Sequence, residues 1–372
     1  MAGVVALDLP GGDPFVVALR AAWDRGDAVL PVDQRLPSAA RQVLFDTLRP
    51  TSIVDGLGEH ACENGAETEP GDALVVPTSG TTGVPKGVVL THDAVRASAL
   101  ATSARLGVGT SDHWLACLPL SHVGGLSVVT RAVVTGTPLT VQPGFDAEMV
   151  TRAARAGATH VSLVATALRR IDPSLFRCIV LGGGRPPVDR PPNTVVTYGL
   201  TETGSGVVYD GVPLDGVDVS IAPDGEVLLR GPMLLRCYRD GSSPLDHDGW
   251  LHTGDVGRWL EDGRLHVDGR RGDLIITGGE NVWPDAVEAV LARHPRVAEV
   301  GVAGVDDPEW GQRVVAWVVP SGEPPSLDEL RVHVRLELPG FAAPREIRLV
   351  DALPRTALGK VRRADLDAPA QA

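Results

Sequence analysis

Two lysines stand out in this chain because almost every other basic residue is arginine. Of the 34 basic residues, only Lys86 and Lys360 are lysines, and each lies in a segment rich in glycine, proline and threonine, at residues 78–87 and 354–360. Lysine is a compact charge on a flexible stem, whereas arginine is a planar fork, so a lysine can reach into a cluster of phosphate oxygens. The two positions indicate nucleotide chemistry, although chance retention of two lysines remains the alternative.

The first of these segments has the composition of a phosphate-binding loop. It reads Thr-Ser-Gly-Thr-Thr-Gly-Val-Pro-Lys-Gly and follows a predicted strand. Glycines let a backbone approach polyphosphate closely, while hydroxyls and a lysine donate hydrogen bonds to it. Proline replaces the second glycine of a Walker loop and no Ser or Thr follows the lysine, so this is a different motif. A plain surface turn is the alternative. The candidate ATP-binding residues here are Thr78, Ser79, Gly80, Thr81, Thr82, Gly83 and Lys86.

Composition restricts the class of partner. The net charge of -13 opposes nonspecific binding to nucleic acid or to an anionic membrane, so local cations must attract any anionic ligand. The four cysteines are widely spaced without a Cys-x-x-Cys pair, which predicts reduced thiols and neither a zinc site nor a disulfide framework. No signal peptide or membrane span is evident. We expect a soluble cytoplasmic protein, and a homodimer stays open because the sequence does not determine the oligomeric state.

The elements that must position these residues follow an α/β pattern. Short apolar runs alternate with alanine-rich helical stretches, which predicts strands at 73–76, 114–118 and 160–163 and helices at 93–106, 125–134 and 147–156. After residue 198, short strands between turn signals predict a β-rich subdomain, with strands at 217–221, 226–230 and 264–267. The last hundred residues predict a compact α+β unit, with helices at 284–293 and 327–336 and strands at 299–303 and 314–319.

The length of 372 residues predicts two or three domains. We expect a shortened N-terminal domain of mixed sheets and helices at 1–268, a hinge in the charged, glycine-flanked stretch 269–273, and a small C-terminal domain at 274–372.

The ordered motifs resemble those of the acyl-adenylate-forming superfamily, which includes acyl-CoA synthetases, peptide-synthetase adenylation domains and luciferases. After residues 78–87 come Tyr-Gly-Leu-Thr-Glu at 198–202, Thr-Gly-Asp at 253–255, Gly-Arg at 269–270, Gly-Gly-Glu-Asn at 278–281 and Pro-Arg-Thr-Ala-Leu-Gly-Lys at 354–360. The resemblance covers nearly the whole chain. It implies binding of ATP, Mg²⁺ and coenzyme A, and a C-terminal domain that rotates between two half-reactions.

The resemblance also implies the role of each residue. Lys360, Thr201 and Glu202 are the expected catalytic residues, and Glu202 is the expected magnesium ligand. Further ATP contacts are expected from Gly182, Gly183, Gly184, Tyr198, Gly199, Thr201, Asp255 and Arg270. Gly278 and Gly279 lie in the expected thioester-forming loop. Gly272 occupies a hinge position that is often Asp or Lys in the superfamily, and glycine tolerates a change of dihedral angle there.

The acid substrate is predicted from the stretches between these motifs. Residues 118–126, 181–184 and 206–217 resemble the o-succinylbenzoate–CoA ligases of actinobacteria, which implies His122, Arg131 and Ser162 as substrate-binding residues. Arg131 ends an apolar run, so it either snorkels to solvent or faces an anion. Two other functions remain open: an enzyme that loads an aryl or acyl group onto a carrier protein, and a non-catalytic protein that binds adenylates.

Overall fold

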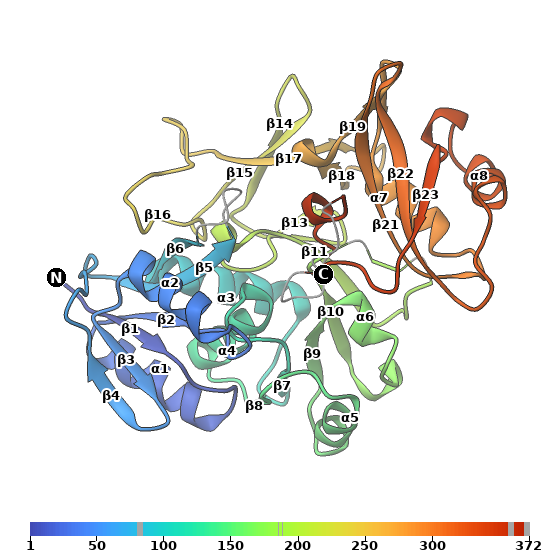
Figure 1. Ribbon diagram of the computed structural model, residues 1–372. Helices are drawn as coiled ribbons and strands as arrows, with labels where there is room; N and C mark the ends of the chain where they lie inside the picture. The colour runs from blue at the N-terminus through green and yellow to red at the C-terminus, as the bar shows by residue number, and fades with distance from the viewer. Residues whose placement is uncertain (80–84, 185, 188, 356–360, 368–372) are drawn as a thin grey trace. The chain divides into compact units, whose positions relative to one another are not determined.

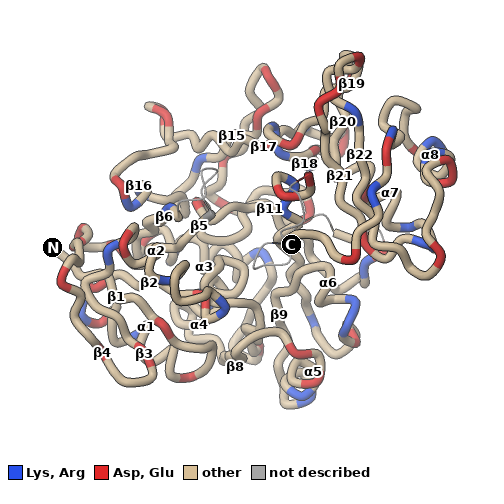
Figure 2. Tube along the Cα trace, viewed as in Figure 1, with Lys and Arg blue, Asp and Glu red and all other residues tan. Residues whose placement is uncertain are grey.

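The computed structural model describes residues 1–79, 85–184, 186–187, 189–355 and 361–367. It divides into two compact units, which are described separately. Unit 1 contains residues 1–220, 228–253 and 261–265, and unit 2 contains residues 221–227, 254–260 and 266–372. Lys and Arg positions are interspersed with Asp and Glu positions along the trace of both units (Figure 2).

The first sheet of unit 1 has seven strands in the order β16-β6-β5-β2-β1-β3-β4. Its central strands are short, apolar and fully buried, and β1 pairs in parallel with both β2 and β3. Side chains of helix α2 complete one hydrophobic core cluster with β1, β2, β5 and β6, and helix α1 packs on β1 and β2. The bounds are β1 (Val4–Leu7), α1 (Asp13–Asp24), β2 (Ala28–Pro31), α2 (Ser38–Leu48), β3 (Ser52–Asp55), β4 (Gly58–Ala61), β5 (Asp72–Ser79), β6 (Pro85–Thr91) and β16 (Cys237–Tyr238).

The second sheet of unit 1 has the order β13-β12-β11-β10-β9-β7-β8. Its strands β8, β7, β9, β10 and β11 are parallel, so their carboxyl ends meet at one edge (Figure 1). Helices α3 and α4 pack on each other, α3 also on β5 and β6 and α4 also on β7 and β9, which joins the two sheets. The bounds are α3 (His92–Leu106), β7 (Trp114–Ala116), α4 (Val123–Thr135), β8 (Leu139–Val141), α5 (Ala147–Arg155), β9 (His160–Leu163), α6 (Ala165–Leu168), η1 (Pro173–Leu175), β10 (Cys178–Leu181), β11 (Thr194–Tyr198), η2 (Thr201–Thr203), β12 (Val208–Tyr209) and β13 (Val212–Pro213).

A four-stranded sheet has the order β14-β15-β17-β18, and the division between the two units passes through its strands. Its strands alternate with turns at glycines of positive φ, such as Gly225 and Gly263. This is the β-rich region that the sequence predicts after residue 198. The bounds are β14 (Asp218–Ile221), β15 (Glu226–Arg230), β17 (Leu251–Trp259) and β18 (Leu265–Arg270).

The remainder of unit 2 is a sheet with helices α7 and α8 packed on one of its faces. The sheet has the order β20-β19-β22-β21, and β23 also pairs in parallel with β22, at residues 315–318. Alternate residues of β22 face opposite sides: Val314, Ala316 and Val318 join α7 and α8 in one core, while Val315 and Trp317 form a second cluster with the C-terminal segment. The bounds are η3 (Arg271–Asp273), β19 (Ile275–Thr277), β20 (Glu280–Val282), α7 (Pro284–Leu291), β21 (Val297–Asp307), β22 (Gly311–Pro320), α8 (Leu327–Arg335), η4 (Gly340–Ala342), β23 (Glu346–Leu349) and η5 (Arg363–Asp365).

The structure confirms the predicted α/β class and each predicted helix and strand, with shifts at the ends. Strand β9 and strand β15 have the predicted bounds, whereas β21 is longer than predicted at both ends. The four cysteines are free. Among the described residues, no helix combines the length and the apolar character needed to cross a bilayer. The position of the hinge remains a prediction.

Candidate active site

Two predicted nucleotide-binding segments lie at the carboxyl edge of the second sheet. Gly182, Gly183 and Gly184 follow β10, and Tyr198 ends the neighbouring parallel strand β11. Gly183 has a φ of +79°, which favours glycine, and a Cβ on Gly182 would lie 3.1 Å from Oγ1 of Thr197. Gly183 and Gly184 are exposed, so their backbone is accessible at this edge. This edge of a parallel sheet is where α/β folds bind nucleotides.

Close backbone packing shapes the turn that carries Thr201 and Glu202. A Cβ on Gly199 would lie only 2.3 Å from the carbonyl oxygen of Ser205, so this position excludes every other residue without a backbone shift. Thr203 is fully buried, and its hydroxyl accepts from the amide of Leu200 at 2.9 Å and donates to the carbonyl of Ser205 at 2.7 Å. These contacts hold the short helix η2 in place after β11.

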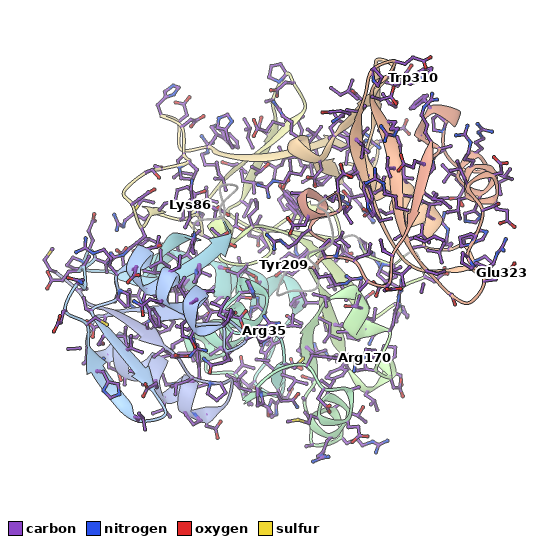
Figure 3. The ribbon with its side chains drawn as sticks, viewed as in Figure 1. Arg35, Lys86, Arg170, Tyr209, Trp310 and Glu323 are labelled. Atoms are coloured by element: carbon purple, nitrogen blue, oxygen red, sulfur yellow. The ribbon has the colours of Figure 1, made fainter. Side chains whose placement is uncertain are left out.

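A tyrosine links Glu202 to the strand that carries Lys86. The hydroxyl of Tyr238 donates to Oε1 of Glu202 at 2.9 Å, and Nζ of Lys86 lies 4.8 Å from the centre of the same ring. Strand β16 pairs with β6 so that Tyr238 is opposite Val88, which places Lys86 diagonally across the pair on the same face. Lys86 is exposed on β6 (Figure 3). The structure thus brings two predicted site residues to one ring.

The predicted phosphate loop lies between two paired strands. Thr78 in β5 is opposite Lys86 in β6, and the antiparallel register extends to Ser79 and Pro85. The other predicted members, Gly80, Thr81, Thr82 and Gly83, lie outside the described residues. The strands therefore place both flanks of the motif beside the Glu202 turn, because η2 packs on β6.

Glu202 fits the role of a magnesium ligand. Among the described residues, no group of three or more His, Cys, Asp or Glu side chains could hold a metal by itself. Mg²⁺ commonly takes one or two carboxylates from the protein and its other ligands from phosphates and water. A single carboxylate oriented by Tyr238 at the predicted nucleotide site matches this pattern. When bound, the ion would neutralise charge on the phosphate oxygens.

Unit 2 contains the predicted ribose-binding pair. Asp255 lies in β17 and Arg270 ends β18, with 3.9 Å between Oδ1 of Asp255 and Nε of Arg270. The Asp255 side chain is only 13% exposed, whereas that of Arg270 is 55% exposed. The neighbouring Gly254 has a φ of +72° and donates its amide to Oε1 of Glu226 at 2.8 Å. The structure brings these two predicted residues together.

The predicted thioester-forming loop is a tight hairpin turn. Thr277 pairs with Glu280, so Gly278 and Gly279 form a two-residue connection between β19 and β20. Both glycines have positive φ, +59° and +84°, as a type I′ turn requires. A Cβ on Gly278 would lie 2.6 Å from a ring carbon of Trp310, which Figure 3 labels. The guanidinium of Arg345 lies over the same ring, 3.8 Å from its centre.

Arg131 is buried without a carboxylate partner among the described residues. It is 2% exposed, its guanidinium lies 4.7 Å from the ring centre of Trp114, and Nη2 donates to Oγ of Ser205 at 3.3 Å. Its Nε and Nη1 atoms are buried and have no hydrogen-bond partner in the described part of the chain. Burial lowers the pKa of Arg131. The snorkelling alternative is therefore wrong, and a buried cation that needs an anion remains.

His122 and Ser162 have different neighbours from Arg131. His122 precedes α4, and its Nε2 lies 3.8 Å from Oδ2 of Asp33, a carboxylate that Arg35 holds through two nitrogens. Burial lowers the pKa of His122, while Asp33 opposes that shift. Ser162 is buried in β9 near the carboxyl edge of the sheet. A substrate pocket shared by these residues and Arg131 stays a prediction.

The remaining predicted residues are Lys360 and Gly272. Lys360 lies outside the described residues. Gly272 lies in η3, where a Cβ would contact nothing within 4 Å and φ is not positive. This conformation therefore does not require glycine at residue 272.

A parallel-sheet edge that carries the predicted nucleotide-binding segments, with a lysine and an oriented carboxylate beside it, suits transfer of an adenylyl group to an acid. That chemistry is characteristic of AMP-forming ligases. The chain belongs to the AMP-binding enzyme family: residues 2–239 match the AMP-binding enzyme family and residues 286–360 match the AMP-binding enzyme C-terminal domain.

Similar proteins carry related names. The chain is 40% identical over 366 residues to a protein of Mycobacterium tuberculosis named probable 2-succinylbenzoate–CoA ligase, covering 91% of this chain and 94% of that one. The structure resembles o-succinylbenzoate CoA synthetase of Bacillus subtilis in complex with its acyl-adenylate intermediate, with a TM-score of 0.88 and 30% identity over 99% of this chain and 88% of that one. It also resembles the same enzyme in complex with ATP and magnesium, with a TM-score of 0.86 and 30% identity over 98% and 89%.

Sequence reasoning missed Tyr238, Ser205 and Asp33. Tyr238 reaches Glu202 through the pairing of β16 with β6, which joins segments about 150 residues apart and leaves no local signal. Ser205 follows the predicted motif by three residues, but Arg131 contacts it from 74 residues away in the sequence, so no local signal marks it. Asp33 comes from the loop after β2 and carries no motif.

Proposed function

We propose that the protein is an ATP-dependent ligase that joins 2-succinylbenzoate to coenzyme A. A carboxylate oxygen of the acid attacks the α-phosphorus of ATP, and the bond to pyrophosphate breaks. The thiol of CoA then attacks the acyl carbon, gives up its proton, and AMP leaves. The similarity to the ligases named above, over nearly the whole chain, supports both half-reactions.

The first half-reaction accumulates negative charge at the α-phosphate, and the proposed residues oppose it. Lys86 and the loop at 78–83 would hold the outgoing phosphates, and Lys360 would stabilise the reacting phosphoryl group. Such groups accelerate the reaction when they bind the transition state more strongly than the ground state. Tyr198 and the glycines at 182–184 would line the adenine site, Thr201 would contact phosphate, and Asp255 with Arg270 would bind the ribose and phosphate.

Arg131 is the single observation that carries the choice of acid. A guanidinium that is 2% exposed, with two nitrogens unpaired among the described residues, lacks the compensation that a buried charge needs. 2-Succinylbenzoate has two carboxylates, so one can react while the other pairs with this cation. An acid with one carboxylate would leave Arg131 uncompensated. His122 and Ser162 are assigned to the same acid site.

A panel of carboxylic acids tests the assignment, with pyrophosphate release and thioester formation measured with and without CoA. We expect 2-succinylbenzoate to support pyrophosphate release, and CoA to convert the adenylate to a thioester. Activation of a simple aryl or fatty acid with no response to 2-succinylbenzoate would refute this substrate. Transfer to a phosphopantetheinylated carrier protein in preference to CoA would favour the carrier-loading alternative. Nucleotide binding without pyrophosphate release for any acid would favour the adenylate-binding alternative.

A cytoplasmic location is also part of the proposal, and a homodimer is one possible oligomeric state. The availability of ATP and CoA in the cytoplasm supports the location. Cell fractionation and light scattering of the purified protein would check the two points.

A further inference from the structure

One arginine near the C-terminus contacts three carboxylates. Nη1 of Arg363 lies 2.8 Å from Asp273, and Nη2 lies 2.7 Å from both Asp285 and Glu288. Its Nε atom donates to the other oxygen of Glu288 at 3.2 Å. We propose that Arg363 is a positioning residue for adenylation: it ties the segment 361–367, which directly follows Lys360 in the sequence, to the predicted hinge. This inference rests on the role of Lys360 in the proposed function.

The charges of the cluster require an arginine. One guanidinium, 10% exposed, faces three partly buried carboxylates, so its removal would leave like charges close together. Burial disfavours the charged form of Arg363, yet Glu288 and Asp285 raise its pKa overall. A planar fork can bond to several carboxylates at once, whereas an ammonium is a single point charge. Arg363→Lys would therefore keep the charge and lose the geometry.

The segment after Lys360 is held against the sheet of unit 2. Val361 forms a bridge with Arg355, and the amide of Arg362 donates to the carbonyl of Pro354 at 2.8 Å. Leu366 is buried, and it packs with Val361 so closely on Gly301 that a Cβ there would lie 3.2 Å from each. The two flanks of residues 356–360 thus pair with each other, and their side chains pack on β21 and β22.

The other end of the cluster is the predicted hinge. Asp273 ends η3, one residue after Gly272, and the first residue of that helix, Arg271, pairs with Asp224 at 2.9 Å. Asp285 and Glu288 both lie in α7. The third contact, to Asp273, joins the C-terminal segment directly to the hinge. A change of dihedral angle at residue 272 would therefore act on the segment next to Lys360.

The test compares Arg363→Lys and Asp273→Ala with the unaltered protein in two measurements. Deuterium exchange of peptides that cover 361–367 should increase in both variants, because the contact to the hinge is lost. Acid-dependent pyrophosphate release should fall at least about 10-fold, since small misplacements of a reacting group cost up to about 10²-fold. Thioester formation from a preformed acyl-adenylate should be unchanged. Arg296→Lys, which alters an arginine paired with Glu323 and Glu329 in the same unit, should change neither measurement.

A double-mutant cycle separates positioning from simple stability. In a Lys360→Ala background, Arg363→Lys should cause no further loss of pyrophosphate release, because the two residues act through one step. Equal losses in both half-reactions, additive losses in the cycle, or unchanged exchange at 361–367 would each overturn the inference. Failure of the proposed function is a separate result: the unaltered protein would then activate no acid, while the exchange measurement would still decide whether Arg363 anchors the segment.

Discussion

At the residue scale, Arg131 is a buried cation whose Nε and Nη1 atoms have no hydrogen-bond partner in the described part of the chain. Its sequence position allowed two interpretations, and only the structure rejects snorkelling, because exposure depends on how α4 packs on β7 and β9. The local sequence showed that a cation lies in an apolar helix, but it did not show which residues surround that cation. Trp114 and Ser205 reach it from a strand and a turn that are distant in sequence.

Replacing Arg131 by leucine should weaken use of 2-succinylbenzoate strongly. Loss of a desolvated charge contact typically costs about 2–5 kcal/mol, so kcat/KM for this acid should fall accordingly. A monocarboxylic aryl analogue has no second anion to lose, so its activation should change much less. Steady-state kinetics with both acids checks this, and the KM for ATP should stay nearly constant.

The matched control for Arg131 is Arg170, which stacks on an aromatic ring but is exposed. Its guanidinium lies 5.1 Å from the ring centre of Phe145 (Figure 3). Arg170→Leu should leave both acids unaffected. Equal losses for both acids in Arg131→Leu would contradict an anion-binding role and indicate a role in packing.

At the scale of elements, local patterns predicted every α-helix described after residue 72 except the short α6, but fewer than half of the strands described there. Strand β9 and helix α5 are examples, because buried apolar residues and an Asp146 cap mark them locally. The site at the carboxyl edge was predictable only through the family resemblance. The order of strands in each sheet was not predictable, because long-range pairing such as β16 with β6 has no counterpart in local patterns.

The turn between β11 and η2 should not tolerate alanine at residue 199. A Cβ there would lie 2.3 Å from a carbonyl oxygen, and overpacking of this kind typically costs about 1–3 kcal/mol. Gly199→Ala should therefore lower the free energy of unfolding and weaken ATP binding, because the shift displaces Tyr198 and Thr201. Urea denaturation and nucleotide titration measure the two effects.

Gly144→Ala provides the comparison for this turn. A Cβ on Gly144 contacts nothing within 4 Å, and its φ is not positive, so stability and ATP binding should be unchanged. If Gly199→Ala behaves like Gly144→Ala, the turn is adaptable and its close packing does not shape the nucleotide site.

At the scale of the whole molecule, the family resemblance predicts two arrangements of the C-terminal domain. In the conformation described, residue 272 has room for a Cβ and an ordinary φ. This conformation therefore does not require glycine at residue 272. Gly272→Pro fixes φ and restricts Arg271, so it should preserve one half-reaction and abolish the other.

Separate assays of pyrophosphate release and of thioester formation from acyl-adenylate would show which half-reaction survives in Gly272→Pro. Gly272→Ala should retain both half-reactions, since alanine still reaches helical and extended dihedral angles. Normal overall thioester formation by a folded Gly272→Pro protein would place the hinge elsewhere.

The exposure of Lys86 beside Tyr238 has a practical consequence for labelling the protein. Apart from the N-terminus, the chain offers primary amines only at Lys86 and Lys360, both in motifs assigned to ATP. A reagent specific for amines would thus report on the nucleotide site with almost no background. Conversely, coupling through lysine to a sensor surface would block the site under study, so a thiol or terminal tag is the better attachment.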